Sequence, residues 1–499
     1  MADTQPRIII AGLSGDSGKT VASLSLIAAL RRSGKRVSVF KKGPDYIDAA
    51  WLSAIAGTAC RNLDTFLVET PDVRLSFIRA AADSDIAIIE GNRGLFDGRD
   101  VDGTHSTAGL AKLLQAPVVL VVDATKSTRT LAALIKGCLD FDPELKIVGV
   151  ILNRIAGERH RKIITDAIIK YCNLPVLGAI PKLGSDRTLI PGRHLGLITP
   201  AEYNSFAELQ NNLTDIATNY LDVNGILNIA AAAPPLTEAK SHVPSADKPK
   251  DIKIGYFSDS IFTFYYPENL AALAEQGAEL VPISSISDAT LPQIDALYIG
   301  GGFPETQAEQ LAGNRTLMES VRKAAVLKMP IYAECGGLIY LSRTLSCKTG
   351  LFLMSSVFPI DLVMHEKPVG HGYTSLKIDS PNPFYDVNTL IKGHEFHYSG
   401  IGEIEQIGDG NIVKTCMAVE SGVGLANKRD GLIFNNVLAC YTHIHALGMK
   451  SWASKFAKKA RLFRAGEIRH NGDTAEIIQR RFSIKDAKNP GARWASAEA

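Results

Sequence analysis

The sequence of 499 residues lacks any apolar run that approaches the roughly 20 residues needed to cross a bilayer. Residues 1–7 are polar, with no cationic stretch ahead of an apolar segment, so we expect no secretory leader. Seven cysteines, an odd number without a C-x-x-C pair, fit neither a disulfide framework nor a zinc site. We therefore expect a cytoplasmic protein without a membrane partner.

The chain also lacks a large net charge, since its 54 Lys and Arg residues nearly balance its 52 Asp and Glu residues. Residues 450–499 hold 12 basic and 5 acidic residues, a local charge of +7, and so the net +2 leaves −5 over residues 1–449. Nucleic-acid-binding proteins usually spread positive charge over the folded body, so no nucleic-acid partner is expected. Residues 450–464 place aromatic and basic side chains at helical spacing, which predicts an amphipathic helix that packs or binds an acidic partner.

Short apolar runs separated by helix-period segments indicate the fold class. In the first half they are residues 8–11, 37–40, 86–89, 118–122, 148–152 and 176–180. A second series comprises residues 252–257, 280–283, 296–299 and 331–333, followed by shorter, strand-rich segments. Strands that alternate with helices predict an α/β protein, in which the first series forms a parallel, doubly wound sheet and the second is a further α/β series.

A stretch with four prolines and no strand or heptad signal, residues 230–250, divides the two series and is typical of a linker. We therefore predict a domain over residues 1–229, a linker over 230–251, a second domain over 252–448 and a basic extension over 449–499.

A glycine-rich loop follows the first predicted strand and precedes a helix, which is the context of a phosphate-binding loop. Small residues turn backbone N–H groups toward phosphate oxygens, a lysine reaches the outer phosphates, and a threonine hydroxyl can ligate Mg²⁺. The spacing departs from G-x(4)-G-K-[ST] by one residue, and position 14 lacks the second lysine of partition-type ATPases. The residues expected to bind nucleotide here are Gly12, Gly15, Ser17, Gly18, Lys19 and Thr20.

Acidic residues stand at the predicted carboxyl ends of neighbouring parallel strands, where ligands of open α/β sheets gather. Mg²⁺ prefers oxygen ligands, so Thr20, Asp45 and Glu90 are the candidate metal ligands. Asp48 and Asp97 are candidate catalytic residues, although aspartates at such positions also cap helices and turns.

Two further residues are assigned to the nucleotide site. Asn153 ends an apolar run and could read the adenine edge, or it could form a turn. Lys41 stands beside the acidic loops and could pair with substrate carboxylates that are not reacting, or it could be a solvated surface charge.

A second centre of chemistry is predicted where an apolar strand runs into Cys335, two glycines and a helical stretch, the form of a nucleophile elbow. A helix N-terminus at the sulfur is expected to lower the thiol pKa. The loop Gly300-Gly301-Gly302 could aim backbone N–H groups at an oxyanion. His443 and His445, on one face if the segment is extended, supply candidates for a base.

Together these segments resemble the cobyrinate a,c-diamide synthase family over residues 7–448. The loop of residues 12–20 has the spacing of dethiobiotin synthetase-like ATPases. The other segments that carry the resemblance are FKKGPDYIDAAW, EGNRGLFDG, GVILNRIAGERH, FYYPENL, GGGFPE, AECGGLIYL and GHEFHYS.

The resemblance implies an N-terminal domain that uses ATP and Mg²⁺ to activate carboxylates, and a C-terminal class I glutamine amidotransferase domain. Cys335 would attack glutamine, with the oxyanion held by the Gly301 and Gly336 amides. His443 matches the base, and His445 stands where many such enzymes place a glutamate. An acyl phosphate formed on the substrate would then be converted to an amide by ammonia.

The implied substrate is a carboxylate-rich tetrapyrrole, and the resemblance leaves cobyrinate, siroheme and nickel sirohydrochlorin open. The segment of residues 364–374 and the cationic extension look more like the siroheme-amidating relatives. A regulatory ATPase with a glutaminase-like binding domain is a competing interpretation, which would not explain Cys335 beside the triple-glycine loop. A homodimer is left open as the assembled state.

Overall fold

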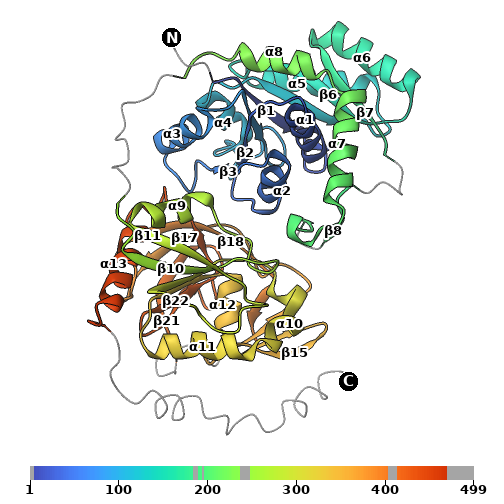
Figure 1. Ribbon diagram of the computed structural model, residues 1–499. Helices are drawn as coiled ribbons and strands as arrows, with labels where there is room; N and C mark the ends of the chain where they lie inside the picture. Colours follow the sequence, from blue (N-terminus) through green and yellow to red (C-terminus); the bar gives the residue numbers. More distant parts are fainter. Residues whose placement is uncertain (1–4, 184–188, 194–195, 237–247, 403–412, 469–499) are drawn as a thin grey trace. The chain divides into compact units, whose positions relative to one another are not determined.

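The computed structural model describes residues 5–183, 189–193, 196–236, 248–402 and 413–468. Its chain divides into two compact units, Met1–Pro244 with Tyr266–Glu268, and Ser245–Tyr265 with Asn269–Ala499 (Figure 1). Each unit has its own sheet and its own hydrophobic core.

The N-terminal unit is built on a parallel sheet in the order β3-β2-β4-β1-β5-β6-β7. Its strands are β1 Arg7–Gly12, β2 Val37–Lys42, β3 Arg61–Leu63, β4 Ile86–Glu90, β5 Val118–Asp123, β6 Ile147–Ile155 and β7 Val176–Pro181. All six predicted strands of this half are present, and β3 was missed because three residues carry no period. The order reverses beside β1, so the loops after β1 and β4 open at the edge where ligands of such sheets bind.

Helices cover this sheet on both faces, because right-handed crossovers that run in opposite directions from the middle of the sheet place their helices on opposite sides. The helices are α1 Lys19–Arg32, α2 Ile47–Ala56, α3 Thr70–Ala81, α4 Thr107–Leu113, α5 Arg129–Phe141, α6 Glu158–Cys172, α7 Phe206–Tyr220 and α8 Val223–Ala231. Side chains of α1, α2, α7 and α8 form one core with Ile8 and Val119 of the sheet. Ile9 and Leu120 point to the other face and are also fully buried. A short hairpin, β8 Gly192–Arg193 with β9 Gly196–Leu197, and a 3₁₀ turn, Pro200–Glu202, precede α7.

The start of the predicted linker belongs structurally to this unit. Helix α8 continues to Ala231, and the guanidinium of the buried Arg7 donates to the carbonyl oxygen of Pro234 at 2.7 Å. Residues 237–247 of the predicted linker lie outside the described residues.

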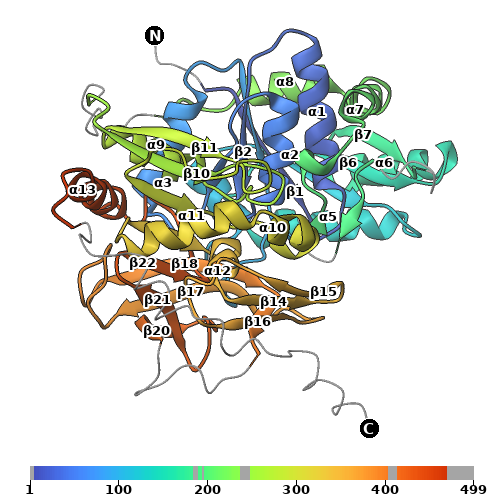
Figure 2. The same ribbon diagram turned by 60° about the horizontal axis from the view of Figure 1, so that its bottom comes forward.

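The C-terminal unit contains a mixed sheet in the order β11-β10-β12-β13-β22-β21-β20-β17-β18-β23 and a smaller one in the order β15-β14-β16-β19 (Figure 2). Strands β11, β10, β12, β13 and β22 are parallel, and the rest of the large sheet is antiparallel. The first strands are β10 Ile252–Phe257, β11 Ala278–Ile283, β12 Ala296–Ile299, β13 Ile331–Glu334, β14 Thr344–Cys347, β15 Gly350–Leu353 and β16 Asp361–Met364. The remainder are β17 Gly370–Ile378, β18 Leu390–His397, β19 Ser399–Ile401, β20 Lys414–Ser421, β21 Arg429–Phe434, β22 Val437–Cys440 and β23 His443–Ile444. Both halves are therefore α/β, as predicted.

Helices of this unit are α9 Pro267–Glu275, α10 Ala308–Gly313, α11 Arg315–Val326, α12 Gly336–Leu341 and α13 Trp452–Arg464, with a 3₁₀ turn at Pro304–Gln307. Helix α13 is the predicted amphipathic helix, and it packs. Trp452 and Phe456 are fully buried, and the Arg461 guanidinium donates to the Asp251 carboxylate at 2.6 and 2.8 Å. Residues 452–464 are therefore part of the C-terminal core.

No helix within the described ranges is long and apolar enough to cross a membrane.

Candidate active sites

The phosphate-binding loop lies between β1 and α1, as predicted. Gly18 has φ 98° and ψ 18° at the N-cap of α1, and a Cβ there would lie 2.0 Å from Nδ2 of Asn153, so only glycine fits. The Lys19 ammonium donates to the carbonyl oxygens of Ser14 and Arg93, each at 2.8 Å. These bonds close the loop around the lysine, and burial lowers the Lys19 pKa.

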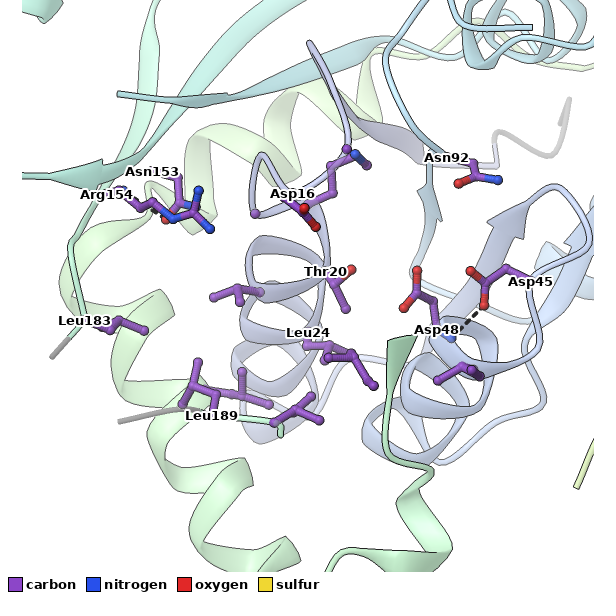
Figure 3. Close-up of a pocket in the computed structure, with 18 of the residues that line it drawn as sticks. Asp16, Thr20, Leu24, Asp45, Asp48, Asn92, Asn153, Arg154, Leu183 and Leu189 are labelled. Atoms are coloured by element: carbon purple, nitrogen blue, oxygen red, sulfur yellow. Dashed lines mark hydrogen bonds between the residues drawn. The ribbon is translucent and has the colours of Figure 1, made fainter. Parts of the chain in front are cut away.

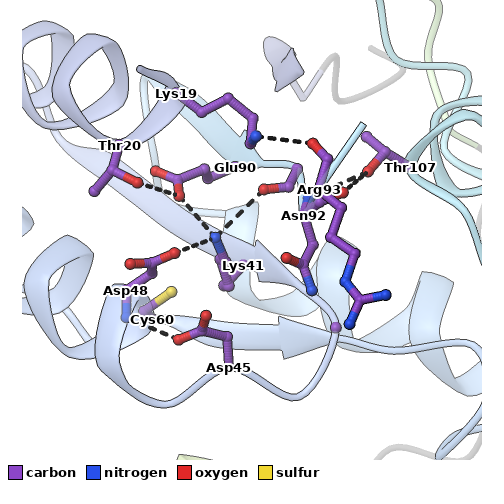
Figure 4. Close-up of polar contacts among 12 residues, drawn as sticks. Lys19, Thr20, Lys41, Asp45, Asp48, Cys60, Glu90, Asn92, Arg93 and Thr107 are labelled. Atoms are coloured by element: carbon purple, nitrogen blue, oxygen red, sulfur yellow. Dashed lines mark hydrogen bonds and ion pairs between the residues drawn. The ribbon is translucent and has the colours of Figure 1, made fainter. Parts of the chain in front are cut away.

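Lys41 and Glu90 are paired across the sheet because β2 and β4 run in register there (Figure 4). Lys41 Nζ lies 2.7 Å from Glu90 Oε1 and 2.6 Å from Asp48 Oδ2, and Thr20 Oγ1 donates to the same Glu90 oxygen at 3.0 Å. Burial opposes the charge on Lys41, but the Asp48 and Glu90 carboxylates outweigh it and raise the Lys41 pKa well above its usual value. Lys41 is therefore a buried bridging cation, and the solvated-surface alternative is wrong.

Asp45, and not Asp48 as the sequence-based alternative had it, accepts a backbone N–H in the first turn of α2. Asp45 Oδ1 accepts the N–H of Asp48 at 2.9 Å in the first turn of α2, whereas the Asp48 side chain turns to Lys41. Asp97 does cap a turn, since its Oδ2 accepts the Gly94 N–H at 2.7 Å. Burial, together with the Asp48 carboxylate, raises the pKa of Asp45 to about 7.

Asn153 supports the phosphate-binding loop from β6. Its Nδ2 donates to the carbonyl oxygen of Ser17 at 3.0 Å, and its Oδ1 accepts the Arg154 N–H. The amide that was expected to read an adenine edge is thus bonded to the loop, although the residue still borders the cavity described next.

These groups line one cavity of about 740 Å³ in the N-terminal unit (Figure 3). One wall is polar and includes Lys19, Thr20, Asp45, Asp48 and Arg93. The opposite wall is apolar and consists of Val21, Leu24, Ile47, Pro181, Leu183, Leu189, Ile190, Leu197 and Leu213. The cavity can hold a ligand that is anionic on one side and apolar on the other.

Two buried side-chain oxygen atoms beside the cavity, on residues that do not line it, could contact a phosphate and a cation. Ser17 Oγ and Glu90 Oε2 are both buried without a hydrogen-bond partner in the described part of the chain. A phosphate oxygen could accept from Ser17, and a hard cation could take Glu90 Oε2 with the Thr20 hydroxyl. No group of three His, Cys, Asp or Glu side chains in the described ranges is arranged to hold a metal alone, so phosphate and water oxygens would complete the shell.

Cys335 occupies the predicted sharp turn, between β13 and α12. Its backbone has φ 48° and ψ −99°, a strained conformation for a residue with a side chain. The turn is held by the Cys335 N–H, which donates to the carbonyl oxygen of Cys440 at 2.7 Å, and by the first bond of α12, from Ile339 N–H. This strand, turn and helix form a nucleophile elbow.

The prediction that the helix N-terminus lowers the Cys335 thiol pKa is wrong. Burial of the sulfur, with the nearby Glu305 carboxylate, raises the Cys335 pKa, and the hydrogen bond from the Gly336 amide lowers it by less. The thiol is therefore protonated at neutral pH and needs a base to act as a nucleophile.

The triple-glycine loop after β12 lies against this turn. A Cβ on Gly336 would approach the Gly302 nitrogen to 2.9 Å, and a Cβ on Gly302 would collide with the carbonyl oxygen of Ile261 at 1.7 Å. The Gly301 N–H, one of the two amides expected to hold an oxyanion, donates instead to the Phe264 carbonyl oxygen at 3.3 Å. The Gly302 amide is therefore the nearer partner of Gly336.

His443 lies on β23 beside this loop, since a Cβ on Gly301 would come within 3.2 Å of its Nε2. Its ring stacks on His394 of β18, with centroids 4.9 Å apart. His445 is in the turn after β23, where its Nδ1 accepts the Leu447 N–H at 3.2 Å. The strand ends at Ile444, so the expected shared face does not extend to His445.

Comparison with known proteins agrees with the two sites. Residues 8–189 match the CobQ/CobB/MinD/ParA nucleotide binding domain, and residues 253–450 match the CobB/CobQ-like glutamine amidotransferase domain. A cobyrinate a,c-diamide synthase of Magnetococcus marinus is 42% identical over 91% of this chain and 97% of its own length. The chain belongs to the cobyrinate a,c-diamide synthase family. Its relative of the same name from Archaeoglobus fulgidus is 40% identical, again over 91% of this chain and 97% of its own length.

Sequence reasoning missed several residues of this cobyrinate a,c-diamide synthase family member. Asp16, Asn92 and Arg154 line the cavity, and each stands within or next to a segment that carried the resemblance. The apolar wall gave no signal, because Leu24, Leu197 and Leu213 come from elements far apart in the sequence. Glu334, directly before Cys335, was also missed, although its carboxylate lies 3.5 Å from His443 Nδ1.

Proposed function

We propose that this protein is an ATP- and glutamine-dependent ligase that amidates the a and c acetate carboxylates of cobyrinate. The observation that carries this proposal is the 42% identity, over 91% of the chain, with a cobyrinate a,c-diamide synthase. Both chemical centres that such a reaction needs are also present, a phosphate-binding loop with its acidic cluster and a cysteine elbow with its histidine.

In the glutaminase half, the Cys335 thiol gives its proton to His443 Nε2 as the sulfur adds to the side-chain amide of glutamine. The amides of Gly336 and Gly302 hold the resulting oxyanion. The proton then passes to the leaving nitrogen, ammonia departs, and water hydrolyses the thioester to glutamate. His443 is assigned as the base because its Nε2 faces the glycine loop, while His445 holds the following turn.

In the synthase half, a substrate acetate attacks the γ-phosphorus of ATP, and ADP leaves. The resulting acyl phosphate is attacked by ammonia at its carbonyl carbon, and phosphate departs as the amide forms. Lys19, Ser17 and the loop amides would hold the phosphates.

The orphaned Glu90 Oε2, with the Thr20 hydroxyl, would hold Mg²⁺, which neutralises charge on the transferred phosphoryl group. Lys41 fixes Glu90 in place and bonds to Asp48. Asp45 and Asp97 order the loops around this centre through the bonds that they accept from backbone N–H groups.

The two walls of the cavity support a tetrapyrrole substrate. A macrocycle is broad and apolar, and its acetate arms are anionic, so the ring suits the leucine-rich wall while one arm reaches Lys19 and Thr20. Arg93 is exposed at the rim of the polar wall and could pair with an arm that is not reacting.

The deciding experiment incubates the purified protein with ATP, Mg²⁺ and glutamine, and follows cobyrinate, hydrogenobyrinate, siroheme and nickel sirohydrochlorin separately by mass spectrometry. We expect cobyrinate to lose about 1 Da for each carboxylate converted to an amide, with a singly amidated species before the diamide. Amidation of siroheme or nickel sirohydrochlorin in preference to cobyrinate would replace the proposed substrate. Amidation of none of the four would refute the tetrapyrrole assignment.

A further inference from the structure

The carboxylate of Glu334 is held at the base of the cysteine elbow without contact with water. It is fully buried at the end of β13, and Tyr298 OH donates to its Oε2 at 3.0 Å. The N–H of Ile444, the residue after His443, donates to its Oε1 at 3.2 Å. Two donors from different elements therefore fix the direction of this side chain.

The same carboxylate faces His443. Glu334 Oε2 lies 3.5 Å from His443 Nδ1, and the side of the ring that carries Cε1 and Nε2 lies against Gly301. The imidazole thus has an acid at one nitrogen and the loop beside the nucleophile at the other. A base held in this way keeps a proton on Nδ1 and leaves Nε2 able to accept one.

A buried network holds this arrangement from the other side. Asn269 Nδ2 donates to Tyr298 OH at 3.3 Å and to the carbonyl oxygen of Ile444 at 2.9 Å. Its Oδ1 accepts the Ala446 N–H at 2.7 Å. Asn269 and Glu334 therefore hold the backbone of β23 and of the turn after it by hydrogen bonds, and these bonds fix the position of His443.

We infer that Glu334 is the positioning residue of the glutaminase half, supplying through His443 the acid that position 445 lacks. This inference rests on the proposed glutaminase chemistry. Glu334 takes no part in the proton transfer: the thiol proton moves from Cys335 Sγ to His443 Nε2 as the S–C bond forms, and it leaves with the nitrogen as the C–N bond breaks. The carboxylate holds the Nδ1 proton and stabilises the imidazolium between these two transfers.

The test compares Glu334→Gln, which keeps the shape of the side chain but removes its charge, with Tyr332→Phe. Tyr332 is buried on the same strand, and its hydroxyl bonds to Tyr385 at 2.8 Å, away from His443. Glutamate release from glutamine gives kcat and KM, and ammonium-driven amidation is measured on the same preparations. Glu334→Gln should lower the glutaminase kcat about 10²-fold or more, with KM for glutamine and ammonium-driven amidation near those of the wild type. Tyr332→Phe should match the wild type.

A double-mutant cycle separates positioning from structural support. Because Glu334 acts through His443, Glu334→Gln should cause no further loss in a His443→Ala background. An equal loss in both backgrounds, or a normal kcat for Glu334→Gln alone, would overturn the inference.

If Glu334→Gln does not fold, Tyr298→Phe replaces it in the same cycle, since it frees the carboxylate without removing its charge. A smaller loss in kcat, again absent in the His443→Ala background, is then expected, and a loss in both would overturn the inference. Failure of the proposed function has a different signature, because ammonium-driven amidation would then be absent from the wild type while glutamate release could still be measured.

Discussion

Lys41 Nζ lies 2.7 Å from Glu90 Oε1, and neither side chain is more than 1% exposed. The pair joins β2 to β4 at the edge where the phosphate-binding loop opens, and Thr20 and Asp48 complete it. A carboxylate and an ammonium removed from water are stable only while each has the other. The acidic cluster of the synthase site is therefore assembled around one buried lysine.

Lys41→Met should strongly destabilise the N-terminal unit, because it leaves Glu90 buried without its cation. Removal of one partner of a buried pair costs about 3–5 kcal/mol, measured here as the free energy of unfolding in urea. Lys112→Met is the matched control, since Lys112 pairs with Asp142 at 2.7 Å but is 40% exposed, and it should cost at most about 1 kcal/mol. Equal losses in the two variants would contradict the importance of the buried pair.

The two chemical halves should separate by nitrogen source. Cys335→Ala should abolish amidation with glutamine and spare amidation with an ammonium salt, because only the supply of ammonia is lost. Lys19→Ala should stop amidation with either source, since phosphoryl transfer is lost. Product mass spectrometry with each source checks both variants, and loss of ammonium-driven synthesis in a folded Cys335→Ala protein would contradict the assignment.

His443→Ala should reduce glutaminase kcat more than His445→Ala. A positioned base contributes about 10²- to 10⁴-fold, whereas His445 accepts a backbone N–H in the following turn and its loss should mainly lower the melting temperature. Glutamate release and thermal unfolding are measured on both variants. A larger kcat loss in the His445 variant would exchange the two roles.

Trp452→Ala should destabilise the C-terminal unit by about 3–5 kcal/mol, the usual cost of removing a fully buried tryptophan. Its ring lies edge-on to Tyr298 and Tyr332, with centroids 5.4 and 5.3 Å away. Lys458→Ala, on the exposed side of the same helix, should change stability by less than about 0.5 kcal/mol. Denaturant unfolding of both variants checks this, and equal stability would show that α13 is dispensable.

Stability should depend on the protonation of Asp430. Burial raises its pKa to about 6, although its carboxylate accepts N–H bonds from Gly431, Tyr441 and Thr442. Between its unfolded value near 3.8 and about 6, the folded state binds more protons than the unfolded state, so this contribution to stability is lost as pH rises through that window.

Asp430→Asn removes the titration. The difference in free energy of unfolding, wild type minus variant, should therefore fall by about 2 kcal/mol between pH 4 and pH 7. Urea unfolding across this range measures it. A difference that stays constant with pH would contradict the raised pKa.

Local pattern was enough to predict the elements that carry the chemistry. Gly18 and Lys19 lie at a strand-to-helix turn, which an apolar run followed by small residues predicts. Cys335 likewise follows a short strand that is apolar up to Glu334. Segment β3 was missed because Arg61–Leu63 is too short to show a period. The capping role of Asp45 was missed because either aspartate could cap the helix, and only the position of Lys41 draws Asp48 away.

Motifs whose residues are close along the chain predicted the α/β fold class, the family and the positions of two candidate centres of chemistry. Which side chains contact one another could not be predicted in this way, because those contacts join distant segments. The Lys41 bridge depends on the register of β2 with β4. The approach of Glu334 to His443 depends on the hydrogen bond from the Ile444 N–H to Glu334, which joins residues 110 positions apart along the chain. The thiol pKa also depended on the fold, because burial by distant segments outweighs the local helix turn. Strand register and burial arise from contacts between segments far apart in the sequence, and local sequence patterns do not predict such contacts.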